Sequence, residues 1–144
     1  MQTYSDTFLK DILTRTRTIA VIGASANPAR PSNSVARYLT LKGFEVFPIN
    51  PGLAGQTLFD RPVYSSLFDL PQNCQIDMVD IFRRSEAVGP IVDAAITHLI
   101  PRGLKAIWMQ IGVINHQAAE NAAAAKLDVV MNRCPKIEYQ RLFG

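Results

Sequence analysis

The chain has 144 residues, a net charge of +3 and a pI near 9.1, and this length favours a single domain. Nearly half of the residues (48%) are apolar and only 19% are charged, which predicts a packed core and argues against disorder. The basic residues are scattered apart from the pair Arg83-Arg84, which argues against a nucleic-acid surface.

The sequence also bears on location. It contains no apolar run long enough to cross a bilayer, and residues 1–6 lack the charged and apolar regions of a signal peptide. The two cysteines, Cys74 and Cys134, are too few for a disulfide framework. We therefore expect a cytoplasmic, monomeric protein that binds neither nucleic acid nor membrane.

The chain opens with a helical pattern followed by a strand pattern. Ser5 is a suitable N-cap for a first helix, because apolar residues recur after it at helical spacing. Residues 18–22 are apolar throughout and rich in β-branched side chains. Such a run is typical of a parallel strand covered on both faces.

A second helix and a second strand follow. We expect Pro28 and Pro31 to prevent an early helix, so that one of residues 32–34 is the N-cap. The helix should stop at Lys42-Gly43, where glycine suits a left-handed C-terminal residue. Residues 45–50 are predicted to form the next strand.

Residues 53–76 are predicted to be irregular. Within them, residues 62–64 suit a short edge strand, where proline is tolerated, and residues 66–70 suit one helical turn. The alternation then resumes with strands expected over 77–82, 105–110 and 127–131 and helices over 85–99, 115–126 and 137–142. In the first of these strands we expect Asp80 to face away from Met78, as a buried carboxylate satisfied by hydrogen bonds.

This alternation predicts an α/β fold, a doubly wound, Rossmann-like parallel sheet with helices on both faces, as one domain over residues 1–144. Ligands of such sheets bind where the strands end. The residues there are Gly23-Ala24-Ser25, Asn50-Pro51, Phe82-Arg83, Gln110-Ile111-Gly112 and Asn132-Arg133-Cys134.

The first strand end suits phosphate. A glycine turn before a helix N-terminus allows close approach of an anion, and Ser25 and Arg30 can add a hydroxyl and a charge. The dinucleotide fingerprint G-x-G-x-x-G is absent after Gly23, and Asn50 holds the place where NAD sites carry an acidic residue. A P-loop is also excluded, because no G-K-S/T follows at the required spacing.

Other chemistries have less support. A nucleophile elbow at Ser25 fails at Asn27, and neither His98 nor His116 stands where it could serve as its base. The His and Cys residues lack metal-ligand spacing. Two alternatives stay open at the strand ends. Arg83 suits either a ligand phosphate or an ion pair, and the Cys134 thiol is either reactive or a small residue before Pro135.

From about Thr16 to Leu142 the chain resembles the stand-alone CoA-binding domain proteins of bacteria and archaea, which are similar to the N-terminal domain of the succinyl-CoA synthetase α subunit. The motifs that carry this resemblance are residues 19–25 (IAVIGAS), 27–32 (NPARPS), 35–39 (VARYL), 48–51 (PINP), 79–86 (VDIFRRSE), 108–113 (WMQIGV) and 132–135 (NRCP).

The resemblance implies that coenzyme A, or an acyl-CoA, binds along the strand edge as the ligand of a non-catalytic carrier, sensor or regulatory module. The residues implied are Gly23, Ala24, Ser25, Arg30, Ser34, Asn50, Pro51, Phe82, Arg83, Gln110 and Gly112. Leu53 stands where the synthetase has a CoA-contacting lysine, so that contact does not carry over. The alternatives are an enzyme acting on acyl-CoA or the CoA thiol, and an NADP- or nucleotide-binding subunit.

Overall fold

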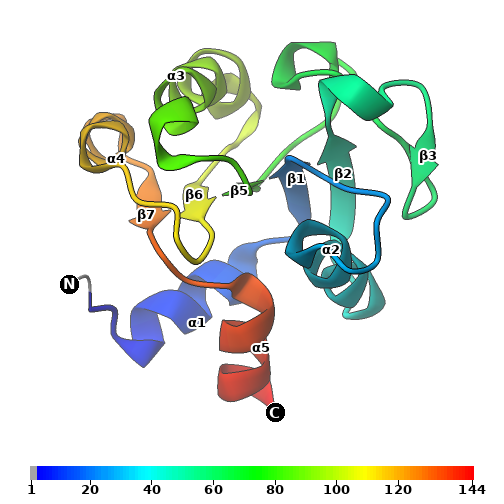
Figure 1. Cartoon of the computed structure of the whole chain (residues 1–144). Coiled ribbons are helices and arrows are strands. Elements are labelled where there is room, and N and C mark those ends of the chain that lie inside the picture. The colour runs from blue at the N-terminus through cyan, green and yellow to red at the C-terminus, as the bar shows by residue number, and fades with distance from the viewer. Residues whose placement is uncertain (1–2) are drawn as a thin grey trace.

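The computed structural model describes residues 3–144. Met1 and Gln2, part of the segment considered as a signal peptide, lie outside the described residues. The helices are α1 (Asp6–Arg15), α2 (Pro31–Leu41), α3 (Val88–Leu99), α4 (His116–Ala124) and α5 (Pro135–Phe143); the strands are β1 (Thr18–Ile22), β2 (Glu45–Ile49), β3 (Thr57–Leu58), β4 (Arg61–Pro62), β5 (Met78–Ile81), β6 (Ala106–Met109) and β7 (Asp128–Val130) (Figure 1).

The predicted doubly wound parallel sheet is confirmed. Its strand order is β2-β1-β5-β6-β7, and all four neighbouring pairs are parallel. The chain runs outward in one direction from β1 to β2 and in the other from β5 to β7. The order therefore reverses between β1 and β5, which is where open α/β sheets leave a crevice at their carboxyl ends.

Helices cover both faces of the sheet, as predicted (Figure 1). One core lies under α3 and α4 and takes alternate strand residues such as Ala20, Val79 and Ile107. The other lies under α1, α2 and α5 and takes the residues between them, including Val21, Met78 and Trp108. The strands are apolar on both faces because each face is covered.

Local signals explain most element boundaries. The Ser5 hydroxyl accepts a hydrogen bond from the Phe8 amide and so caps α1, as predicted. Asn115 caps α4 in the same way through the Ala118 amide. The C-terminal helix returns to the N-terminal one, because Arg141 of α5 forms an ion pair with Asp6 of α1.

The predicted start of α2 is wrong. The helix begins at Pro31 with Arg30 as N-cap and no side-chain cap. Proline suits the first helical position because its missing N–H would have had no helical partner. Ser32 and Asn33 are instead buried in the first turn, and Asn33 donates a hydrogen bond to the Ser25 carbonyl. Pro135 opens α5 likewise, two residues before the predicted start.

The predicted edge strand over residues 62–64 is largely wrong. Arg61 and Pro62 pair antiparallel with β3 in a small separate hairpin, and only Tyr64 bridges to Ile49 of the main sheet. Val63 cannot extend that bridge, because its amide bonds the Gln56 carbonyl and its carbonyl accepts from Gly55. Ser66 caps the expected turn over residues 67–69.

The orientation predicted for Asp80 is also wrong. Residues two apart on a strand share a face, so Asp80 lies on the same side as Met78, in register with Val21 of β1 and Trp108 of β6. It is fully buried in the core under α2 and α5. Along the whole described chain, no helix combines the length and apolar character needed to span a membrane.

Candidate functional site

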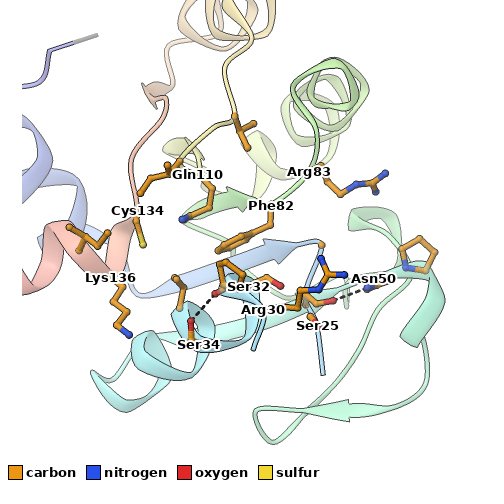
Figure 2. A pocket seen from close by; sticks show the side chains of 18 residues that line it. Ser25, Arg30, Ser32, Ser34, Asn50, Phe82, Arg83, Gln110, Cys134 and Lys136 are labelled. Atoms are coloured by element: carbon orange, nitrogen blue, oxygen red, sulfur yellow. Dashed lines mark hydrogen bonds between the residues drawn. The ribbon is translucent and has the colours of Figure 1, made fainter. Parts of the chain in front are cut away.

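A groove of about 1040 Å³ opens at the carboxyl edge of the sheet, where the strand order reverses (Figure 2). This volume is at the upper end for small-molecule sites. Its lining comes from the ends of β1, β2, β5 and β6 and from the starts of α2 and α5: Gly23, Ala24, Ser25, Arg30, Pro31, Ser32, Ser34, Val35, Asn50, Pro51, Phe82, Arg83, Gln110, Ile111, Val113, Cys134, Lys136 and Ile137.

The groove brings together ten of the eleven residues that the resemblance implies as CoA ligands; the exception is Gly112, whose amide bonds the Asn132 side chain outside the lining. Of the strand-end residues Asn132, Arg133 and Cys134, only Cys134 lines the groove. Leu53 does not line it either. Sequence reasoning missed Ser32, Lys136 and Ile137 because they lie in the first turns of helices rather than at strand ends. They would be found if the residues expected to contact a ligand included the first turn of the helix that follows each strand end.

The glycine turn after β1 is built differently from the expected phosphate cradle. The amides of Gly23 and Ala24 both donate to the Ile49 carbonyl, at 3.0 and 3.2 Å, so these N–H groups are already used. Gly23 has φ +85°, and a Cβ added there would lie 2.5 Å from the Phe82 carbonyl oxygen. The glycine therefore allows the ends of β1 and β5 to approach each other.

Two other N–H groups remain for a ligand. The amides of Asn33 and Ser34 bond the Arg30 carbonyl, whereas the Ser32 amide, one position earlier in α2, lacks an intrahelical acceptor. The Ser25 hydroxyl accepts a hydrogen bond from the Asn27 amide at 3.1 Å, which orders the loop, and the Ser25 amide is not used by the turn. We predict that these two amides receive an anion.

Asn50 joins the first two strand ends. Its Nδ2 donates to the Ala24 carbonyl at 2.7 Å (Figure 2), and its Oδ1 accepts from the Gly52 amide at 2.8 Å. The nitrogen and the oxygen of the Asn50 side-chain amide are therefore each hydrogen-bonded to a main-chain group. Asn50 shapes this end of the groove, and an aspartate there could not make the bond to Ala24.

The groove is electrostatically one-sided. Its lining contains Arg30, Arg83 and Lys136 and no acidic side chain. The ion pairs of the described chain use none of these three cations, and the Lys136 ammonium lies over the ring of Tyr38, 5.5 Å from its centroid. Unpaired cations in a concave site attract anions, and a guanidinium can bind phosphate bidentately.

The other end of the groove is more enclosed. Phe82, Gln110 and Cys134 lie side by side there (Figure 2), and the residues Gln110 and Cys134 are only 6% and 5% exposed. The Trp108 indole donates to the Arg133 carbonyl at 2.9 Å, which holds the start of α5 against β6. This end suits an uncharged, partly apolar portion of a ligand.

Three buried oxygens beside this end have no hydrogen-bond partner among the described residues: both carboxylate oxygens of Asp80 and the Oε1 of Gln110. The expectation that Asp80 is satisfied is therefore wrong. Burial raises the pKa of the Asp80 carboxyl well above its usual range, because removal from water disfavours the charged form.

A smaller apolar pocket of about 190 Å³ adjoins the groove across Gly23, Pro51 and Arg83, which line both. Its walls are the turn at Leu67-Phe68 and α3, through Ile91 and Ala94. Within residues 3–144 the structure contains no group of three or more His, Cys, Asp or Glu side chains suited to a metal ion.

Comparison with known proteins gives a family and a set of similar chains. A family described as a CoA binding domain matches residues 17–140. The protein YneT of Bacillus subtilis (strain 168) is 32% identical over 139 residues, covering 96% of this chain and 97% of YneT.

Two solved structures extend the likeness to the whole fold. A hypothetical protein from Pyrococcus horikoshii OT3 is 34% identical, with a TM-score of 0.88 over 100% of both chains. The cell-free ID.343 protein from Thermus thermophilus is 32% identical, with a TM-score of 0.85 over 97% of this chain and 100% of that one.

Proposed function

This chain belongs to the CoA-binding domain family, and on that premise we propose that it binds coenzyme A or an acyl-CoA in the groove as a non-catalytic carrier, sensor or regulatory module. The observation that carries the proposal is the set of three groove cations, Arg30, Arg83 and Lys136, with no acidic residue in the lining. CoA carries several phosphate charges, and such a field favours their binding.

The shape of the site suggests how CoA lies. The phosphates rest between the Ser25 and Ser32 amides and the two arginines. The adenine ring enters the apolar pocket at Phe68, because a flat base buries well against apolar walls. The pantetheine arm follows the groove past Phe82 to Gln110 and Cys134.

Titration by calorimetry and thermal unfolding tests this assignment, with CoA, acetyl-CoA, dephospho-CoA, NADP and NAD as ligands. We expect CoA to stabilise the fold by about 2.7 kcal/mol at about a hundredfold excess over its Kd. Dephospho-CoA should bind less tightly, because it lacks one phosphate. Stabilisation by NADP without stabilisation by CoA contradicts the proposal and supports a dinucleotide site.

The role of the groove cations is tested by a pair of adjacent arginines. Arg83→Gln should weaken CoA binding about tenfold or more, because it removes a charge-assisted contact with phosphate. Arg84→Gln is the matched control, since Arg84 is exposed and lines neither cavity, and its affinity should be nearly unchanged. Equal losses of CoA affinity in the two variants would show only a general effect of net charge. They would overturn the placement of the CoA phosphates at Arg83.

The non-catalytic role is supported by the lining, where Cys134 is the one thiol and which includes no His, Asp or Glu. Proton transfer in enzymes relies chiefly on those groups. Acetyl-CoA incubated with the protein should release no free CoA, and mass spectrometry should find Cys134 unmodified. Acylated Cys134, or turnover that Cys134→Ala abolishes, would favour the enzyme alternative.

A further inference from the structure

We propose that Asp80 is a neutral carboxylic acid whose proton is donated to Gln110 Oε1, so that the Gln110 amide presents its NH₂ to the groove and selects a carbonyl oxygen of the ligand. This rests on the proposed function for the identity of the ligand, a pantetheine amide or an acyl thioester. Asp80 is a positioning residue in this arrangement and does not touch the ligand.

The strand register places the two side chains close together. Asp80 lies opposite Trp108, and Gln110 is two residues beyond Trp108 and so on the same face of the sheet. The two residues are thus diagonal neighbours on adjacent parallel strands, and the long Gln110 side chain can extend toward Asp80. Figure 2 shows Gln110 between Phe82 and Cys134 in the groove, and Asp80 is fully buried.

The buried, unpartnered atom of the Gln110 amide is its oxygen, Oε1, and not its nitrogen. With the amide in this orientation, hydrogen-bonding inventory determines the protonation of Asp80. An ionised Asp80 and Gln110 Oε1 are acceptors only, so they repel each other, and each would remain unsatisfied at a cost. One proton on Asp80 supplies a donor for the Gln110 oxygen and removes a buried charge at the same time. The oxygen of Gln110 then faces the protein, and its nitrogen faces the groove.

Nothing nearby favours the charged form of Asp80. The register neighbours Val21 and Trp108 do not titrate, and the buried residues of α1 and α2 include no ionisable group. From α5, the buried titratable groups are the Cys134 thiol and Glu138, and Glu138 is paired with Arg141 at 2.7 Å. The Asp80 carboxyl thus has no cation to stabilise its negative charge.

The protonation state can be measured without a ligand. Infrared difference spectra of wild type and Asp80→Asn at neutral pH should show a protonated carboxylic acid band that the variant lacks. Wild type should also lose stability relative to the variant as pH rises. The unfolded Asp80 ionises above about pH 4 while the folded one stays protonated, so the unfolded state then binds fewer protons. A missing band together with a pH-independent difference in Tm overturns the proposal.

Binding measurements test the orientation of Gln110. With acetyl-CoA as the ligand, which carries both the pantetheine amides and a thioester, Asp80→Asn keeps an N–H donor toward Gln110 Oε1 and should bind within about threefold of wild type, whereas Asp80→Leu should lose about tenfold. Gln110→Glu places a second acceptor oxygen at the groove and should also lose tenfold or more. If both Asp80 variants retain full affinity while the fold is intact, Asp80 does not position Gln110.

Acetyl-CoA and S-ethyl-CoA, which lacks the thioester carbonyl, identify the carbonyl that is read. If Gln110→Glu weakens only acetyl-CoA, the thioester is the partner; if it weakens both ligands equally, the partner is a pantetheine amide. Each result supports the proposal, and no effect on either ligand overturns it. Failure of wild type to bind any CoA species contradicts the proposed function instead, and leaves the infrared result as a separate test of Asp80.

Discussion

Gly23→Ala is expected to destabilise the fold by about 3 kcal/mol or more. Two costs add at this position. The backbone has φ +85°, a region that L-residues other than glycine adopt with strain, and the new Cβ would lie 2.5 Å from the Phe82 carbonyl oxygen. That oxygen belongs to the main chain, so relief requires the ends of β1 and β5 to separate and the groove to widen.

Gly43→Ala is the matched control for this prediction. Gly43 has φ +98°, but a Cβ there would meet nothing within 4 Å, so the variant carries the backbone strain without the clash. Its cost should be about 1–2 kcal/mol. Chemical denaturation of both variants measures the difference, and CoA titration should show a large loss for Gly23→Ala alone. Equal free energies of unfolding for the two variants would mean that the close approach of position 23 to the Phe82 carbonyl adds no cost.

Ser25→Asp is expected to weaken CoA binding by about 100-fold at low salt while leaving the fold intact. A carboxylate about 6 Å from a phosphate charge costs about 2.8 kcal/mol at an effective dielectric constant near 20. The loop should survive, because an Asp oxygen can accept the Asn27 amide as the Ser25 hydroxyl does.

Ser25→Asn separates charge from shape in this experiment. Asparagine offers the same local hydrogen bond with no charge, so its affinity should stay within about threefold of wild type. The loss in Ser25→Asp should also shrink at high salt, because ions screen exposed charges. An unchanged affinity in Ser25→Asp places the phosphates elsewhere, whereas an equal loss in both variants points to a steric effect.

Much of the fold was predictable from the sequence. The strands of the main sheet are short apolar runs and the helices carry apolar stripes, and both periodicities depend on local spacing alone. Side-chain caps at Ser5 and Asn115 were predictable for the same reason. One error arose where a residue could serve two purposes. Pro31 was expected to block a helix and opens one, because the outcome depends on whether its place is the first helical position.

The glycine turn after β1 shows most clearly what could not be predicted from the sequence. The pattern after β1 indicated a ligand-binding turn at the carboxyl edge, and the structure brings it into one groove with Asn50, Phe82 and Gln110. Sequence could not show that the Gly23 and Ala24 amides are already bonded to Ile49. Nor could it show that the Phe82 carbonyl oxygen lies where a side chain at position 23 would place its Cβ.

The amino-acid sequence by itself determined the class of fold, the edge of the sheet that carries the groove and the family to which the chain belongs, because hydrophobic period and chain-order motifs are local properties. Only the tertiary structure decided which groups at that edge remain available. Arg30, just before α2, and Lys136, in α5, line one groove although they are far apart in the chain, and Asp80 and Gln110 come onto one face of the sheet only when β5 and β6 pair. Hydrogen-bond partners, burial and the surroundings of a charge depend on contacts between segments that are distant in the sequence. The local pattern of residues does not reveal these contacts.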